Sequence, residues 1–334
     1  MKVLAGDVGG TKTLLLVAEC DAGGCRKLRQ ERFESDAYDG LSPMVQGFLS
    51  TAGDAAEGLD HACFGIAGPV EGDAGGQRAR VTNLPWELDS TRLAATLGLV
   101  RVRLINDFQA VGHGIDALPA ADLIPLQEGR PVLGGPRVLI GAGTGLGEGL
   151  LIWQGGHYEV LPSEGGHTDF APTDTDQVAV FEALRRRYGR VSYERVLSGR
   201  GLVNLLEHLP RAPSEQPSVE LNKAMHAGDP AAAISEFALE ERDRLAERAL
   251  ECFVRIYGAK AGNLALTCLA TGGVFLAGGI APKILPRLRE GPFMTAFRDK
   301  GRMAGLLATV PVRVIRNPQV GLLGAALAAM KSAG

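Results

Sequence analysis

The sequence lacks the features of a membrane-bound or secreted protein. No apolar stretch reaches the length of a bilayer span without a glycine or a charged residue, and Asp7 interrupts the N-terminal apolar run before it attains the core of a signal peptide. The five cysteines include no CxxC pair, and their odd number suits a reducing compartment. We therefore expect a cytoplasmic protein without a membrane partner. We also expect Cys20 and Cys25, which flank a Gly-Gly turn, to be free thiols rather than a disulfide or a metal pair.

An excess of charge of one sign is also missing. The chain has 35 Lys and Arg residues against 38 Asp and Glu residues, a net charge of −3, with no basic stripe or basic tail. Binding to a phosphate backbone relies on clustered positive charge, so no nucleic-acid partner is expected. The 334 residues, 46% of them hydrophobic, are ordinary for a globular enzyme with two domains.

Apolar runs and glycines predict an α/β protein in which one motif occurs twice. Strands are expected at residues 2–8, 14–20, 26–33, 63–67 and 102–105, and helices at 41–51 and 106–118. The Pro- and Gly-rich segment 119–136 is interpreted as a crossing between domains. Beyond it, strands are expected at 138–140, 149–153, 274–277 and 312–315, a mainly helical region at 177–266 with its longest stretch at 230–269, and a last helix at 321–330. A strand, a glycine loop and a returning strand appear at the start and again near the middle, which indicates a duplicated α/β unit.

The first glycine loop has the composition of a phosphate site. Its residues are Gly6, Asp7, Val8, Gly9, Gly10 and Thr11. Converging backbone N–H groups beside small side chains hold phosphate, and the Asp7 carboxylate can hold a water of Mg²⁺, an ion that prefers one or two carboxylates with waters and phosphate oxygens. The alternative is a plain hairpin turn in which Gly9 and Gly10 supply the positive φ. On local evidence alone the plain turn is favoured.

The second glycine loop, GAGTGLG at residues 141–147, is richer than a turn requires. Its candidate phosphate contacts are Gly141, Gly143, Thr144 and Gly145. No Lys-Ser/Thr pair follows, so the loop is not a P-loop. Leu146 stands where a dinucleotide fingerprint has its third glycine, and a strand follows where that motif has a helix. Four glycines that weaken local structure indicate close approach of a ligand or of backbone.

A third glycine element, TGGVFLAGGI at residues 271–280, is an expected buried strand with a glycine pair at each end. Gly278 and Gly279 would let a flat purine lie against the backbone. A tight turn from strand to helix explains the second pair equally well.

Candidate hydroxyl-binding residues fall on three segments. Asn106 and Asp107 follow a buried strand, where α/β proteins place their sites; Asp107 is a candidate base, although a helix N-cap is favoured on local grounds. Residues 163–170 combine Glu164, His167 and Asp169 around two glycines. These three residues would suit a polyol, and they also invite a metal interpretation, but no cysteine cluster follows to complete a zinc site. Glu194, in a Ser-Tyr-Glu sequence, is on local evidence a helix-start charge.

Taken together, these segments resemble the bacterial glucokinase family. The resemblance is carried by residues 6–11, 104–108, 140–147, 161–172, 191–203 and 272–280, and also by 81–86, 297–302 and 318–325. Segments 161–172 and 191–201 are the most specific, since a DxGGT motif is shared by many sugar kinases. Lys12 and the residues at Gly68-Pro69 depart from the family pattern.

The resemblance implies a fold, a reaction and a set of roles. The fold would be the two-domain actin-like, hexokinase-like ATPase fold, built from duplicated ribonuclease H-like units, with a small domain of residues 1–117 completed by 318–334 and a large domain of residues 118–317. ATP with Mg²⁺ would phosphorylate glucose at its 6-hydroxyl, the entry step of glycolysis, in a homodimer. Asp107 would be the base, and the sugar would be bound by Asn106, Asp107, Glu164, His167 and Glu194. The two glycine loops would hold the phosphates, Asp7 would hold Mg²⁺ through water, and Gly278 and Gly279 would contact adenosine, with no zinc site.

Other functions are weighed against this one. A non-catalytic, sugar-sensing repressor of the same superfamily would need a DNA-binding motif ahead of the first strand, and the strand expected at residue 2 leaves no room for it. An actin-like filament protein is disfavoured by the polar cluster at 164–169. A kinase for mannose, fructose or an N-acetylhexosamine is not distinguished by the sequence.

Overall fold

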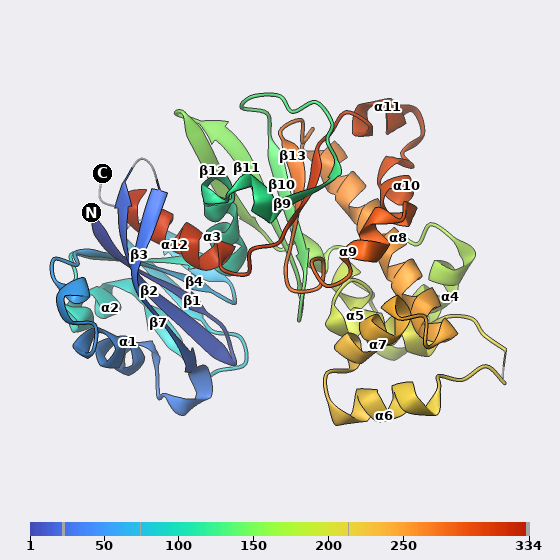
Figure 1. The fold of residues 1–334 in the computed structure, drawn as a ribbon, viewed down its shortest axis with the longest axis horizontal. Coiled ribbons are helices and arrows are strands. Elements are labelled where there is room, and N and C mark those ends of the chain that lie inside the picture. The colour runs from blue at the N-terminus through green and yellow to red at the C-terminus, as the bar shows by residue number, and fades with distance from the viewer. Residues whose placement is uncertain (22–23, 74, 213, 332–334) are drawn as a thin grey trace. The chain divides into compact units, whose positions relative to one another are not determined.

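The computed structural model describes residues 1–21, 24–73, 75–212 and 214–331, and the chain forms two compact units (Figure 1). Unit 1 comprises Met1–Pro119 and Asn317–Gly334, and unit 2 comprises Ala120–Arg316. Strands and helices alternate in both units, which confirms the expected α/β class. No helix in the described ranges is long and apolar enough to cross a membrane.

Unit 1 is built on a five-stranded sheet of order β3-β2-β1-β4-β8. The antiparallel part consists of β1 (Lys2–Val8), β2 (Lys12–Asp21) and β3 (Gly24–Glu34), and the parallel part adds β4 (His61–Ile66) and β8 (Arg101–Asn106) to β1. Both faces of β1 are covered because successive side chains of a strand point to opposite faces. Leu4 and Val8 belong to one core cluster, and Val3 and Ala5 belong to another on the opposite face.

The α-helices in the described part of unit 1 pack on this sheet. They are α1 (Leu41–Ser50), α2 (Ser90–Leu97), α3 (Asp107–Gly114) and α12 (Val320–Lys331). The C-terminal α12 packs against β1, β2, β4 and α3, and its small residues let it lie close to them. A Cβ atom on Gly324 would stand 1.7 Å from the Ala110 carbonyl oxygen, so this position admits only glycine.

Unit 1 also contains a small three-stranded sheet that the sequence did not predict. It is formed by β5 (Val70–Asp73), β6 (Gly76–Arg80) and β7 (Glu87–Asp89), paired antiparallel. It joins the main sheet through Gln77, whose Oε1 accepts a hydrogen bond of 2.9 Å from the Leu104 N–H of the edge strand β8.

The expectation of free thiols at Cys20 and Cys25 was wrong. The two residues are direct partners in the register of β2 and β3, with their Cα atoms 4.1 Å apart, and they form a disulfide. Opposed positions on neighbouring antiparallel strands bring the two sulfur atoms together, which the spacing in sequence did not reveal. Cys63, Cys252 and Cys268 are free cysteines.

Unit 2 repeats the sheet pattern of unit 1. Its order is β12-β11-β10-β13-β14-β9, in which β12 (His157–Ser163), β11 (Leu146–Gln154) and β10 (Arg137–Ala142) are antiparallel, and β13 (Gly273–Ala277) and β14 (Val312–Ile315) continue parallel to β10. The extra strand β9 (Leu123–Gln127) pairs antiparallel with β14. Three antiparallel strands followed by two parallel ones therefore occur twice, which confirms the expected duplication. Strand β9 lies within segment 119–136, where the sequence predicted only a Pro/Gly-rich crossing.

The helices of unit 2 are α4 (Thr175–Tyr188), α5 (Gly199–His208), α6 (Val219–Ala227), α7 (Pro230–Leu239), α8 (Arg244–Thr267), α9 (Leu285–Arg289), α10 (Pro292–Arg298) and α11 (Ala304–Leu307). The long stretch at 230–269 is thus two helices, separated where Glu241 has a φ of 55°. The central helix α8 packs against α5, α7 and α10 and against β10, and its buried face joins the core of the unit.

Asp243 fixes the start of α8, and its removal is expected to be costly. Its Oδ1 accepts the Ala246 N–H at 2.9 Å, and its Oδ2 accepts the N–H of Ser218, the residue before α6, at 2.7 Å. Because the carboxylate is buried and serves two helices, we expect Asp243→Ala to lower the free energy of unfolding by about 2–4 kcal/mol.

The matched control is Asp229→Ala, which removes the exposed N-cap of α7 and should cost about 1 kcal/mol. Chemical denaturation of both variants measures the difference. Equal losses would mean that the bond to Ser218 contributes nothing.

Candidate active site

The first glycine loop lies in unit 1, between β1 and β2. The Gly9 N–H donates to the Lys12 carbonyl oxygen at 3.1 Å, and the Ser35 hydroxyl donates to the Gly9 carbonyl oxygen at 2.8 Å. Neither Gly9 nor Gly10 has a φ in the left-handed region, so the expectation of a positive-φ turn was wrong. Glycine is required at position 10 for a different reason, because a Cβ atom there would stand 2.4 Å from the Thr82 carbonyl oxygen.

Asp7 lies one residue before the end of β1, at the mouth of this loop. Burial raises the pKa of its carboxyl group, and the positive charge of Lys12 acts in the opposite direction. A carboxylate beside a glycine-rich turn is a donor set that fits Mg²⁺, which takes oxygen ligands and keeps several waters. Asp7 therefore places one carboxylate next to the first glycine loop.

The second glycine loop lies at the equivalent hairpin of unit 2, between β10 and β11. Ala142 pairs with Leu146, so residues 143–145 form the turn. The Gly199 N–H, at the start of α5, donates to the Gly143 carbonyl oxygen at 2.7 Å. The Glu194 carboxylate accepts the Leu146 N–H at 3.1 Å, and a Cβ atom on Gly145 would stand 2.6 Å from that carboxylate. Glu194 and the start of α5, both far from the loop in sequence, thus hold the loop in place.

The third glycine element lies beside the second loop. Gly278 follows β13 with a φ of 80°, and a Cβ atom there would stand 2.5 Å from the Ala142 carbonyl oxygen. The Ile280 N–H donates to that same carbonyl oxygen at 3.2 Å. A Cβ on Gly279 would meet no atom within 4 Å. The carboxyl ends of β10 and β13 therefore place Gly278 and Gly279 next to residues 141–147.

Asn106 and Asp107 lie in unit 1, where β8 ends and α3 begins. Asn106 is the N-cap of α3, with its Oδ1 accepting the Phe108 N–H at 2.9 Å, and the Gln109 side chain accepts the Asn106 N–H to complete a capping box. The Asn106 side chain also donates to the Gly68 carbonyl oxygen at 3.1 Å. Asp107 is the first helical residue, and its Oδ1 accepts its neighbour's N–H at 2.9 Å. The capping hydrogen bonds fix the conformation of Asn106, and Asp107 therefore lies just beyond the carboxyl end of β8.

Glu164 and His167 lie on an exposed turn in unit 2. His167 ends the short 3₁₀ helix Gly165–His167, and its Nε2 lies 3.9 Å from the Glu164 carboxylate. The His167 side chain is 58% exposed and the Glu164 side chain is 68% exposed. Asp169 is paired with Arg190 at 2.7 Å, and Arg190 also donates to the His167 carbonyl oxygen. Within the described ranges no three His, Cys, Asp or Glu side chains gather as a metal site would require. Glu164 and His167 thus face solvent, while Asp169 is held by an arginine.

The turn that carries Glu194 packs on the turn that carries His167. The Tyr193 N–H donates to the Thr168 carbonyl oxygen at 3.0 Å, and the Phe170 N–H donates to the Val191 carbonyl oxygen at 3.0 Å. Unit 2 therefore gathers Glu164, His167 and Glu194 with the second glycine loop. Asn106, Asp107 and the first glycine loop belong to unit 1.

Sequence reasoning missed several residues that hold these loops. Ser35 fixes the first loop, Ser198 caps α5 beside the second, and Lys260 with Glu148 lies beneath the turn of His167. The signal for the last two was present, since Glu148 interrupts an apolar strand and Lys260 falls on the apolar face of α8.

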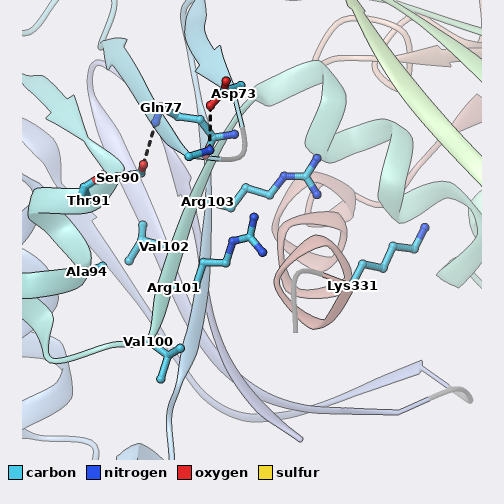
Figure 2. A pocket seen from close by; sticks show the side chains of 11 residues that line it. Asp73, Gln77, Ser90, Thr91, Ala94, Val100, Arg101, Val102, Arg103 and Lys331 are labelled. Atoms are coloured by element: carbon cyan, nitrogen blue, oxygen red, sulfur yellow. Dashed lines mark hydrogen bonds between the residues drawn. The ribbon is translucent and has the colours of Figure 1, made fainter. Parts of the chain in front are cut away.

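A separate hollow of about 510 Å³ in unit 1 is not lined by any of the predicted site residues. Its described lining comes from the β5–β6 hairpin, α2, β8 and the end of α12. Figure 2 shows Arg101 and Arg103 on β8, with Lys331 of α12 also at the hollow and Asp73 and Gln77 at its far end. The Asp73 carboxylate accepts a hydrogen bond of 2.8 Å from the Gly75 N–H.

Comparison with known proteins decides the family. The family model described as glucokinase matches residues 4–332, and the chain is 46% identical to the glucokinase of Nostoc punctiforme over 98% of its length and 99% of that protein's. The chain belongs to the glucokinase family. The resemblance seen in the sequence is thereby confirmed, and the protein is an enzyme of this family.

Solved glucokinase structures share the fold. A glucokinase from an Antarctic psychrotroph superposes with a TM-score of 0.82 at 27% identity, with 99% of each chain covered. A ROK family glucokinase from Streptomyces griseus, solved in complex with glucose and AMPPNP, superposes with a TM-score of 0.64 at 21% identity, covering 99% of this chain and 100% of that one. The hexokinase-like fold expected from the sequence is confirmed by these glucokinase structures.

Two variants of Glu194 should separate its contact with the glycine loop from its negative charge. Glu194→Ala loses both the charge and the bond to the Leu146 N–H, and should raise KM for ATP and for glucose by about tenfold each, the effect of one hydrogen bond to a charged group. Glu194→Gln keeps an acceptor for that N–H and should raise KM mainly for glucose. Steady-state kinetics with each substrate varied in turn measures both. If the two variants behave alike toward ATP, the bond to Leu146 does not support the loop.

Proposed function

We propose that this member of the glucokinase family transfers the γ-phosphoryl group of ATP to the 6-hydroxyl of D-glucose, giving glucose 6-phosphate and ADP. The observation that carries the proposal is the pair of equivalent glycine hairpins, one in each copy of the sheet, with Asp107 at the end of a parallel strand in unit 1. Phosphoryl transfer needs positioned phosphates, charge neutralisation and a group that orients the attacking hydroxyl. The described residues include candidates for each requirement.

In this proposal each site residue has one role. Asp107 accepts the proton of the 6-hydroxyl as that oxygen attacks the γ-phosphorus and the bond to the β-γ bridging oxygen breaks. Asn106, Glu164, His167 and Glu194 bind the other hydroxyls. The backbone of the two glycine loops binds the phosphates, with Thr11 and Thr144 as hydroxyl donors, and Gly278 and Gly279 leave room for adenosine.

Mg²⁺ supplies charge neutralisation on the phosphates when bound, and Asp7 is the residue we propose to hold it, through water. Its position at the end of β1, beside Gly9 and Gly10, supports this assignment. No zinc is assigned a role.

We further propose that units 1 and 2 act as the small and large domains of the enzyme, with boundaries near 117 and 317. The family resemblance supports a homodimer that works in the cytoplasm at the start of glycolysis. Light scattering on the purified chain measures the oligomeric state, and a monomer at micromolar concentration would contradict the dimer.

A hexose panel tests the reaction. Release of ADP is measured with glucose, mannose, fructose and N-acetylglucosamine, each with Mg²⁺ and with the metal chelated. We expect the highest kcat/KM for glucose, and loss of turnover without Mg²⁺ that Mg²⁺ alone restores. A higher kcat/KM for another sugar would reassign the substrate. Stoichiometric zinc in the active protein would contradict the metal assignment.

A further inference from the structure

A buried ion pair lies beneath the turn that carries Glu164 and His167. Lys260 on α8 and Glu148 on β11 are 7% and 1% exposed, and the Lys260 Nζ lies 3.1 Å from the Glu148 Oε1. Taking two charges out of water costs several kcal/mol per ion, and a pair of apolar residues of similar volume is often at least as stable. Stability alone is therefore a weak reason for such a pair, and its other contacts indicate what it does.

The Lys260 ammonium contacts both segments that carry the proposed sugar-binding residues. It donates to the Gly165 carbonyl oxygen at 3.2 Å and to the Thr168 hydroxyl at 3.1 Å, which lie on either side of His167. It also lies over the Tyr193 ring, 4.6 Å from the ring centroid, next to Glu194. The fixed donors of one buried cation thus span the two turns.

Glu148 packs against the same turn, at Gly165. A Cβ atom on Gly165 would stand 2.0 Å from the Glu148 Oε2, so the turn rests directly on this carboxylate. Burial raises the pKa of Glu148, while the charge of Lys260 and its hydrogen bond lower it. Glu148 therefore depends on Lys260 as its compensating charge, and the two act as a unit.

We propose that Lys260 and Glu148 are positioning residues for glucose, which hold the Gly165–His167 turn so that Glu164 and His167 point into the sugar site. The proposal rests on the proposed function of those two side chains. Lys260 and Glu148 themselves do not touch the sugar. Their effect is on the geometry of the groups that do, and misplacing such groups by about 1 Å can cost on the order of 10²-fold in rate.

The main test is the double variant Lys260→Met with Glu148→Gln. Methionine retains an unbranched stem of similar length and glutamine the shape of glutamate, so neither leaves a buried charge behind. We expect the KM for glucose to rise at least about tenfold, because hydrogen bonds from a charged group to the turn are lost. The melting temperature should stay within a few degrees of the wild type, and the KM for ATP should change less than about twofold. Unchanged glucose kinetics in the folded double variant would overturn the proposal.

Two further variants keep the test decisive. Thr168→Val, at an exposed position, removes the hydroxyl that accepts from the ammonium and donates to the Gly165 carbonyl oxygen, and should raise the KM for glucose by a smaller factor. Arg255→Met is the matched control: it breaks ion pairs of the same helix, to Asp174 at 3.4 Å and Glu251 at 3.6 Å, and should leave glucose kinetics unchanged. An effect of Arg255→Met equal to that of Thr168→Val would contradict a specific role for Lys260.

Non-additivity separates this proposal from the one on which it rests. If Lys260 acts through His167, adding the Lys260→Met, Glu148→Gln changes to His167→Ala should cost much less than the two separate losses would together. Full additivity would overturn the positioning role. If Glu164→Gln and His167→Ala both show wild-type kinetics, the sugar site itself is wrong, and a raised KM in the Lys260 double variant would then need another cause.

Discussion

Replacing Asp107 with alanine or asparagine is expected to lower kcat by about 10²–10⁴-fold, the usual contribution of a general base. The residue lies at the carboxyl end of β8, as the first residue of α3, and the capping box formed by Asn106 fixes the backbone on which it stands. Because the base takes its proton only as the phosphoryl group is transferred, glucose affinity should stay within a few-fold of the wild type.

Rapid-quench measurement of a single turnover gives the chemical step, and a glucose titration gives affinity in the same preparations. Asp89→Asn is the matched control, since Asp89 is the N-cap carboxylate of α2 in unit 1, accepting the N–H groups of Thr91 and Arg92 at 3.0 Å. If the Asp107 carboxylate only supports the start of α3, both replacements will lower the melting temperature and leave kcat intact. Near-wild-type turnover in Asp107→Asn would remove it as the base.

Glu164→Gln and His167→Ala are each expected to lower kcat/KM for glucose by about 10–100-fold, the effect of one hydrogen bond to a charged or strongly polar partner. Both side chains are exposed, and the distance of 3.9 Å between the His167 Nε2 and the Glu164 Oε2 is too long for a hydrogen bond between them. A site built on hydrogen bonds to hydroxyls rejects sugars that lack them, because its own polar groups are left unpaired. The ratio of kcat/KM for glucose to that for mannose or 2-deoxyglucose should therefore become smaller.

Kinetics with the three sugars measures this change, together with the KM for ATP, which should move little. Asp169→Asn is the control on the same turn, because Asp169 already pairs with Arg190 at 2.7 Å. Its replacement should leave the ranking of sugars as it is. Wild-type selectivity in both Glu164→Gln and His167→Ala would mean that this turn does not bind the substrate.

Much of the fold follows from local sequence. The apolar runs that form β1, β2, β10 and β13, and the glycines at their ends, mark both copies of the sheet. The small sheet of β5, β6 and β7 gave no such signal, because its strands are short and mostly polar, with only one buried residue in each of β6 and β7 and none in β5. Strand β9 contains Pro125, a residue that marks edge strands and loops alike.

The sequence nominates the residues of the candidate site but not the contacts that hold them. Glycine at position 10 is legible in sequence, yet its reason is the approach of the Thr82 carbonyl oxygen, 72 residues further along. Glu194 lies in the first turn of the 3₁₀ helix Tyr193–Arg195, as the local sequence indicates, but its bond to the Leu146 N–H, 48 residues away, gave no local signal. Cys20 and Cys25 became a disulfide through strand register, which spacing alone does not fix. Each failure concerns a contact that only the folded chain creates.

The return of α12 to unit 1 sets the order in which the newly made protein can fold. Helix α12 supplies Leu322, Ala325, Ala326 and other residues of the core on one face of the unit 1 sheet, so that face stays uncovered until α12 has been synthesised. Unit 2, Ala120–Arg316, is continuous and is complete before then. Domains usually mature from the N-terminus onward during synthesis. In this chain the core of unit 1, whose strands are made first, can be completed only after the residues of unit 2 have been synthesised.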